Sequence, residues 1–178
     1  APIGDIMGGL SAALGIVSAL QYRNRTGKGQ MIDVALLDTL VALMTNITQL
    51  YLVGGQIPTQ FGNRYASACP NEEYSASDGM LVIAAANDAL WKKMCAVMDR
   101  MDLFENPVYK TNYDRVQHAD EIKVEIEKWL SDKTVEQAFS LLEGAGIPAA
   151  PIYNIKQVAE DPHLAIDRQM FVKTTHPK

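Results

Sequence analysis

The sequence predicts an α/β fold in two parts, and two observations support that prediction. Over residues 6–53, an apolar helical pattern, a strand-like run and a second apolar helical pattern follow one another with short connections, which is typical of an α/β layer. Beyond the Gly- and Pro-rich residues 54–73, the pair Asp78-Gly79 separates two strand-like runs, and such a pair predicts a β-hairpin. The second part is therefore expected to combine helices with a short antiparallel sheet.

The first predicted helix covers residues 6–24 and is apolar on all sides. Its apolar run, residues 6–20, is shorter than the roughly 20 residues of a membrane span and has no basic segment ahead of it. We therefore expect a buried core helix. A helix of this kind has to be covered by other elements, and few predicted elements of this chain are free to cover it. We accordingly expect the 178 residues to be a piece of a longer protein.

Asp5 is an isolated carboxylate at the start of this helix, among small residues. Aspartate is a preferred N-cap, which is the simplest interpretation. The free N–H groups of a helix N-terminus also stabilise a negative charge, and an ionised carboxylate can act as a nucleophile when a group is passed between two acceptors. The two interpretations do not exclude each other. Gly27 is expected to end the helix in a left-handed conformation.

The remaining elements follow from apolar spacing, capping residues and turn residues. Residues 30–35 are predicted to form a strand, and residues 36–53 a helix that ends at Gly54-Gly55. Asn87 is expected to cap a helix, and Thr134 a second one through a capping box with Gln137. Buried positions are expected at Trp91, Met94, Cys95 and Met98, strands at 74–77, 80–85, 149–153 and 170–173, and helices at 114–130 and 154–160.

Composition excludes several classes of partner. A net charge of -5 and a pI near 5.2 argue against nucleic acid or an anionic membrane surface. Cys69 and Cys95 form neither a disulfide framework nor a metal-binding spacing, so a cytoplasmic location fits best.

Other catalytic or binding motifs are not apparent. The histidines His118, His163 and His176 are scattered, and we predict no metal site. The segment Thr26-Gly27-Lys28-Gly29 superficially resembles a phosphate-binding loop. However, it follows a helix and precedes a strand-like run, which is the reverse of the order in a P-loop. Asp5 therefore remains the chief candidate nucleophile.

A series of short motifs resembles the class III CoA-transferases, also called the CaiB/BaiF family, which includes formyl-CoA transferase and acyl-CoA racemases. The resemblance covers essentially the whole chain, in order and at the family's spacing. The motifs are Gly4-Asp5 with Gly9-Leu10, residues 25–34, Gly62-Asn63, Ser77-Asp78-Gly79, Asn87-Asp88 with Trp91, Asn106-Pro107 with residues 110–112, Arg115-Val116, residues 146–148 with Pro151-Ile152, and Asp161-Pro162 with Arg168 and Met170.

The resemblance implies a domain organisation. Residues 1–55 would end the N-terminal segment of a Rossmann-like large domain, residues 56–72 would be a linker, and residues 73–155 would form a small α+β domain. Residues 156–178 would be a linker that returns toward the large domain. Family members are interlocked dimers, so the full-length protein is expected to be a homodimer.

The resemblance also implies a reaction. Asp5 falls on the catalytic aspartate, which forms an aspartyl–acyl anhydride and then an aspartyl-CoA thioester as CoA moves from an acyl-CoA to a small carboxylic acid. The CoA thioester is a substrate, and no cofactor is expected to be permanently bound. The racemase branch, in which the aspartate works as an acid/base with a histidine, and a catalytically inactive fold fragment are the alternatives.

Candidate substrate- or CoA-binding residues are Leu36, Gly62, Asn63 and Tyr65. For Asn63 and Tyr65, ordinary exposed loop positions are the alternative interpretation. The sequence departs from the family just after them, where the run Cys69-Pro70-Asn71-Glu72-Glu73 replaces the more usual Ala-Pro-Tyr.

Overall fold

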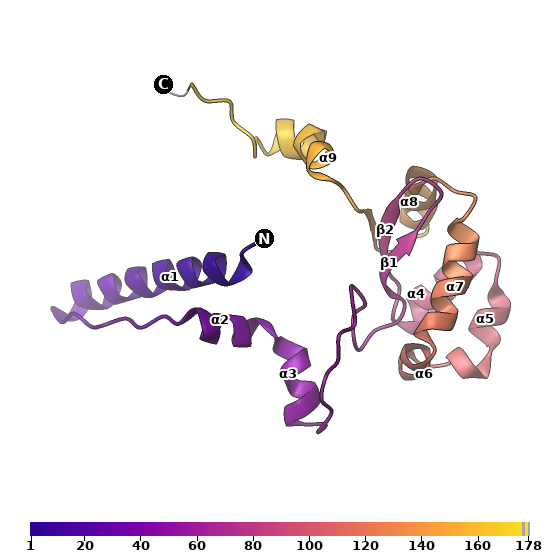
Figure 1. The fold of residues 1–178 in the computed structure, drawn as a ribbon, viewed down its shortest axis with the longest axis horizontal. Helices are drawn as coiled ribbons and strands as arrows, with labels where there is room; N and C mark the ends of the chain where they lie inside the picture. Colours follow the sequence, from indigo (N-terminus) through magenta and orange to yellow (C-terminus); the bar gives the residue numbers. More distant parts are fainter. Residues whose placement is uncertain (176, 178) are drawn as a thin grey trace. The chain divides into compact units, whose positions relative to one another are not determined.

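A computed structural model describes residues 1–175 and 177 of the chain. The chain divides into two units, residues 1–60 and residues 61–178 (Figure 1). The first unit contains helices α1 to α3, and the second contains a three-stranded sheet with the remaining helices. Each unit is described by itself below.

Helix α1 (Ile3–Thr26) begins and ends slightly outside the predicted range. Its N-cap is Pro2, with no side-chain cap, so Asp5 lies within the first turn and the N-cap interpretation of Asp5 is wrong. The C-terminus follows the prediction, because Gly27 adopts φ 73° and its N–H donates to the carbonyl of Arg23 at 2.8 Å. Glycine adopts this left-handed conformation without the steric cost of a Cβ atom.

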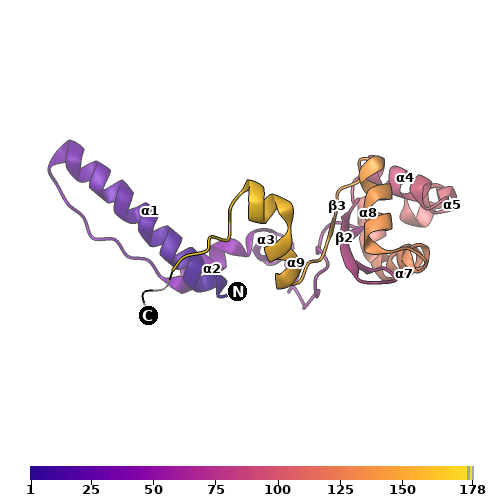
Figure 2. The same ribbon diagram turned by 90° about the horizontal axis from the view of Figure 1, so that it is seen from above.

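Glycines on α1 let the following chain pack closely against it. A Cβ atom at Gly8 would lie 2.2 Å from Cδ2 of Leu36, and one at Gly15 would lie 3.0 Å from Cγ2 of Ile32. Leu36 opens helix α2 (Leu36–Leu43), which runs beside the N-terminal half of α1 in both views (Figures 1 and 2). The small residues of α1 therefore serve helix–helix contact.

Within the 178 residues most of α1 is nevertheless uncovered, so the other elements of this chain do not bury it as a core helix. Gly8 and Ala19 are its buried residues. By length and composition α1 could cross a membrane, and 11% of its most apolar stretch is buried within the structure. Length and composition do not distinguish a membrane span from the core helix of a soluble protein.

Two further predictions in the first unit are wrong. Residues 30–35 are irregular rather than a strand, and within the described residues no strand pairs with them, so their backbone groups lack the partners that a sheet provides. The predicted helix 36–53 is two helices, α2 and α3 (Thr45–Leu52). The break falls where Thr45 has φ 30°, a conformation that β-branched residues rarely adopt.

The second unit is built on the predicted hairpin. Strand β1 (Asn71–Ser75) pairs antiparallel with β2 (Met80–Ala84), which pairs antiparallel with β3 (Ala149–Pro151). The register places Glu73 opposite Val82. Residues 170–173 do not form the predicted strand and are irregular.

Helices gather on one side of this sheet, as Figure 2 shows for α4, α7 and α8. Asn87 caps α4 and Thr134 forms the predicted capping box of α8. The predicted helix 114–130 is interrupted at His118. The helices are α4 (Asp88–Val97), α5 (Met101–Glu105), η1 (Pro107–Tyr109), α6 (Asn112–Gln117), α7 (Ala119–Leu130), α8 (Val135–Gly144), α9 (Ile155–Glu160), which Asn154 caps as predicted, and a π-helical turn η2 (His163–Asp167).

The hydrophobic core lies between the sheet and these helices, within residues 69–147. Trp91, Met94 and Cys95 of α4 and its C-cap residue Met98, all predicted to face inward, are buried there. Strand β1 contributes Tyr74, β2 contributes Leu81 and Ile83, and α7 contributes Ile126, each fully buried. This core supports the loop of residues 61–70, which carries three of the predicted binding residues.

Candidate functional site

Asp5 lies in the first turn of α1 as its third residue. The side chain is exposed, and no hydrogen bond or ion pair engages it among the residues that the structure describes. The N–H groups of a helix's first turn have no partner within the helix, and together with the helix dipole they stabilise a nearby negative charge. The arrangement leaves an accessible carboxylate whose negative charge is favoured by its position.

Small and apolar groups surround this helix start. Gly4 and Gly8, four residues apart and therefore on one face of α1, face Leu40 and Leu36 of α2. Leu36, a predicted binding residue, is 48% exposed and contacts α1 one turn after Asp5. The structure thus brings Leu36 close to the helix turn that carries Asp5. The absence of bulky side chains at Gly4 and Gly8 permits close approach to the backbone.

The other three predicted binding residues lie in the second unit, on the loop formed by residues 61–70. Gly62 has φ 64°, which favours glycine. The side-chain amide of Asn63 donates to the carboxylate of Glu73. The backbone N–H of Tyr65 donates to the carbonyl of Asn71 at 2.9 Å, while the side chain is 49% exposed. The loop therefore presents Tyr65 to solvent from a backbone that is tied to β1.

An ion-pair network that the sequence did not reveal holds this loop. Arg64 Nε donates to Glu72 Oε1 at 2.8 Å, and Arg64 Nη2 donates to Asp120 Oδ1 at 2.8 Å. Glu72 is 5% exposed and also accepts from Lys123 Nζ at 2.8 Å. A buried carboxylate is stable only with such partners. The one feature of the sequence that could have drawn attention to Arg64 was its position between two candidate binding residues, Asn63 and Tyr65.

Arg115 is the second anchor of the loop and is completely buried. It donates to the carbonyls of Cys69 at 3.0 Å and Ala86 at 2.6 Å, and to Asp88 Oδ1 at 2.9 Å. Its guanidinium also lies 5.7 Å from the ring centre of Trp91. Arg115 thereby joins the end of the loop, the connection after β2 and the start of α4. The sequence identified Arg115 as part of a motif but gave no indication of its burial.

Other candidate nucleophiles are in unsuitable environments. Burial raises the pKa of the Cys69 and Cys95 thiols to about 12, so both remain protonated near neutral pH. His118 Nδ1 lies 3.0 Å from Glu121 Oε1, and His163 Nδ1 lies 3.4 Å from Asp167 Oδ2. His176 lies outside the described residues. Within the described residues no cluster of metal-ligating side chains occurs.

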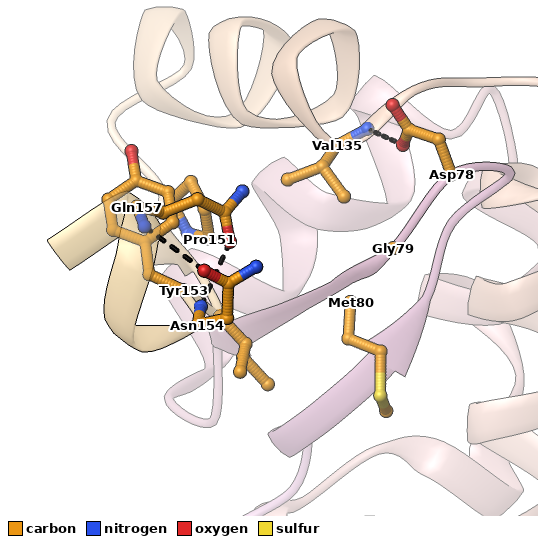
Figure 3. A pocket seen from close by; sticks show the side chains of 9 residues that line it. Asp78, Gly79, Met80, Val135, Pro151, Tyr153, Asn154 and Gln157 are labelled. Carbon is orange, nitrogen blue, oxygen red and sulfur yellow. Dashed lines mark hydrogen bonds between the residues drawn. The ribbon is translucent and has the colours of Figure 1, made fainter. Parts of the chain in front are cut away.

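A cavity of about 500 Å³ lies between the hairpin turn, the start of α8 and the segment after β3 (Figure 3). Three of its polar side chains, Asp78, Asn154 and Gln157, are already engaged. Asp78 Oδ1 accepts from the N–H of Val135 at 2.8 Å, and the side chains of Asn154 and Gln157 bond each other's backbone N–H groups. These contacts cap helices α8 and α9. We assign this cavity a structural role.

Comparison with known proteins identifies the family of the chain. The family model described as "CoA-transferase family III" matches residues 1–178. The chain belongs to CoA-transferase family III. This confirms the resemblance seen in the motif series.

Named relatives of this family III chain transfer CoA. It is 34% identical over 98% of its length to succinyl-CoA:mesaconate CoA-transferase of Haloarcula marismortui, 33% identical over 97% to acetyl-CoA:oxalate CoA-transferase of Acetobacter aceti, and 32% identical over 97% to human succinyl-CoA:glutarate CoA-transferase. It spans 43%, 44% and 39% of these relatives, respectively.

Solved structures share the fold of the family III chain. A CaiB/BaiF family protein from Brucella suis matches with a TM-score of 0.72 and 32% identity, covering 91% of this chain and 43% of that one. A hypothetical protein from Mycobacterium tuberculosis matches with a TM-score of 0.78 and 27% identity, covering 93% and 43%. Mixed helices with a small antiparallel sheet are therefore consistent with a CaiB/BaiF-like fold.

Proposed function

We propose that this chain is the central segment of a CoA-transferase that moves CoA from an acyl-CoA thioester to a small carboxylic acid. The observation that carries the proposal is the match of the family III model to the whole chain. The names of the relatives support the same chemistry. We assign the nucleophilic role to Asp5, supported by its exposed position in the first turn of α1 and by the family motif around it.

The proposed reaction passes through four acyl transfers. The Asp5 carboxylate attacks the thioester carbonyl, the C–S bond breaks, and CoA leaves as a thiolate while a mixed anhydride forms. The thiolate then attacks the aspartyl carbonyl, which releases the donor acid and leaves an aspartyl-CoA thioester. The acceptor carboxylate attacks this thioester and expels the thiolate again. Finally the thiolate attacks the acceptor's acyl carbonyl, which yields the new acyl-CoA and regenerates Asp5.

The residues around Asp5 have defined tasks in this scheme. The N-terminus of α1 stabilises the carboxylate before attack. Gly4 and Gly8 let Leu40 and Leu36 pack against this part of α1, and Leu36 supplies an apolar contact for the substrate. On the second unit, Gly62, Asn63 and Tyr65 bind substrate or CoA. The exposed phenol of Tyr65 is a suitable hydrogen-bond donor for a carboxylate.

We further propose a small dicarboxylic acid as the acceptor, because the names of three relatives specify mesaconate, oxalate and glutarate. The same proposal includes the domain organisation, the oligomeric state and the cellular location of the full-length protein. Residues 1–55 belong to the large domain, 56–72 to a linker, 73–155 to the small domain and 156–178 to a returning linker. The full-length protein is a cytoplasmic homodimer.

Substitution of Asp5 in the full-length protein tests the mechanism. Asp5→Asn keeps the shape but removes the nucleophile, so we expect kcat to fall by about 10³-fold or more. Asp38→Asn is a matched control, because Asp38 is also an exposed aspartate in the first turn of a helix of the same unit. We expect its kcat to stay within about twofold of the unsubstituted value. Full activity of Asp5→Asn would refute the assignment.

Isotope exchange separates transfer from racemisation. A transferase of this type leaves the acyl α-proton in place, whereas a racemase exchanges it with deuterium from the solvent. We expect no deuterium at the α-carbon during turnover in D₂O.

The isolated 178-residue chain is expected to have no transferase activity and to bind CoA weakly in calorimetry, because it spans less than half of its relatives. Robust turnover by the isolated chain would contradict that expectation.

A further inference from the structure

The loop of residues 61–70 is held to the second unit at separate points, and the two halves of the loop depend on different side chains. In the second half, Asn112 Oδ1 accepts from the N–H of Cys69 at 3.0 Å, and Asn112 Nδ2 donates to the carbonyl of Ser67 at 2.9 Å. Arg115 adds its bond to the carbonyl of Cys69. Residues 67–69 are thus fixed by α6.

The first half of the loop lacks these contacts and carries the proposed binding residues. The Asn63 side chain and the Tyr65 N–H bond to β1 alone, whereas the Arg64 side chain bonds to two elements of the second unit. Its Nε donates to Glu72 on β1, and its Nη2 donates to Asp120 on α7, a residue 56 positions later in the sequence. The guanidinium therefore connects the loop to a strand and a helix at once.

The chemistry of this contact favours a fixed geometry. Arg64 is about three-quarters buried, and Glu72 is almost completely buried. The bond to Glu72 joins two largely buried groups and is therefore stronger than an exposed surface pair, whereas the bond to Asp120 has one exposed partner. The two carboxylates are reached by different nitrogens of one planar group, so both bonds can form together only in a narrow range of loop conformations.

We propose that Arg64 is a positioning residue, which holds the backbone between Gly62 and Tyr65 in the conformation that presents Asn63 and Tyr65 to substrate. This inference rests on the proposed function, because it takes Asn63 and Tyr65 as substrate-binding residues. Arg64 itself has its nitrogens directed to Glu72 and Asp120 and acts through its neighbours.

Removal of Arg64 should loosen the loop without unfolding the unit. In Arg64→Met, Lys123 still pairs with the buried Glu72 at 2.8 Å, so that carboxylate does not become an unpaired charge. Asp120 has a side chain that is 92% exposed and can return to water. Arg100→Met is the matched control, because Arg100 also joins two carboxylates in the same unit, Asp102 and Glu125, and neither belongs to the loop of residues 61–70.

Two measurements test the proposal. In the 178-residue chain, hydrogen exchange of the amides of residues 62–66 should become about tenfold faster in Arg64→Met and stay unchanged in Arg100→Met. In the full-length protein, Arg64→Met should raise KM for the acceptor acid about tenfold with kcat nearly unchanged, as expected for the loss of uniform binding. Arg64→Lys should restore part of the affinity, because one charged bond can re-form.

Each outcome supports or overturns a defined part of the inference. Unchanged exchange in Arg64→Met would show that Arg64 does not order the loop. Faster exchange with an unchanged KM would overturn the role in substrate binding. If the unsubstituted full-length protein transfers no CoA, the proposed function fails and the binding role fails with it, whereas the exchange measurement still decides whether Arg64 orders the loop.

Discussion

The two units differ in how they use their apolar residues. In the second unit, Ile122, Ile126 and Leu130 of α7 are at most 1% exposed, while the opposite face of α7 carries charges. In the first unit, Leu10 and Leu14 of α1 are 61% and 68% exposed. Burial of apolar side chains is the main force that stabilises a folded unit. The comparison shows that the second unit is stabilised by its own core.

The first unit is held together by the hydrogen bonds within its helices and by contacts between α1 and the chain that follows it. Helix α1 has its backbone hydrogen bonds, its Gly27 terminus and the glycine contacts to Leu36 and Leu40. A helix that is apolar on all sides is stable in water only when other surfaces cover it. The candidate nucleophile, Asp5, thus lies on the unit that buries little of its own apolar surface, and the loop residues lie on the unit with the core.

The largest expected effect is the loss of a core side chain in the second unit. Ile126→Ala removes apolar contacts at a fully buried position, and we expect unfolding of the 178-residue chain to require about 3 kcal/mol less. Leu14→Ala is the matched change in the first unit and should cost less than about 0.5 kcal/mol. Urea unfolding followed by far-UV circular dichroism measures both units, whereas fluorescence of Trp91 and Trp129 reports on the second. Equal losses for the two variants would contradict the comparison.

A slightly smaller loss is expected from the buried arginine of the second unit. Arg115→Met leaves the carbonyls of Cys69 and Ala86 without their donor, and we expect a cost of about 2 kcal/mol in the same urea experiment. Arg100→Met is the control, because its ion pairs are partly exposed and should contribute less than about 1 kcal/mol. A negligible effect of Arg115→Met would show that the network does not stabilise the unit.

The last effect concerns pH, is absent near neutral pH, and again separates the units, since both cysteines lie in the second. Burial raises the pKa of Cys69 and Cys95 from 9.0 to about 12. Between these values the unfolded thiols lose protons that the folded thiols retain, so the folded state is progressively destabilised. The free energy of unfolding should therefore be unaffected by these groups below pH 9 and should fall as the pH rises from 9 toward 12.

Alanine substitution of both cysteines should reduce this alkaline slope in urea unfolding. Some slope should remain, because burial also raises the pKa of Tyr74. An unchanged slope would show that the thiols ionise equally easily in the folded and unfolded states.

Capping and turn residues in the sequence predicted the secondary structure of the second unit better than that of the first. Asn87, Thr134 and Asn154 cap helices as their sequence contexts indicated, and Asp78-Gly79 lies in the hairpin connection. These features depend on residues within a few positions of one another. In contrast, the predicted strand at residues 30–35 required a partner strand, and apolar spacing cannot show whether one is present.

The candidate site was also only partly predictable. The motif around Asp5 drew attention to the carboxylate, but its place inside the first turn depends on where α1 begins, and helix boundaries are weakly determined by sequence. Arg64 and Arg115 were missed as anchors because their partners, including Asp120 and Asp88, are distant in the sequence. Their roles follow from tertiary contacts.

Trapping the covalent intermediate is the most direct test of the central assignment. The full-length protein is incubated with an acyl-CoA donor and hydroxylamine, digested and examined by mass spectrometry. An activated aspartyl carbonyl reacts with hydroxylamine to form a stable hydroxamate, so we expect this modification at Asp5, dependent on acyl-CoA, and not at Asp38. Sustained CoA transfer without hydroxamate at Asp5, or a hydroxamate at another carboxylate, would contradict the account.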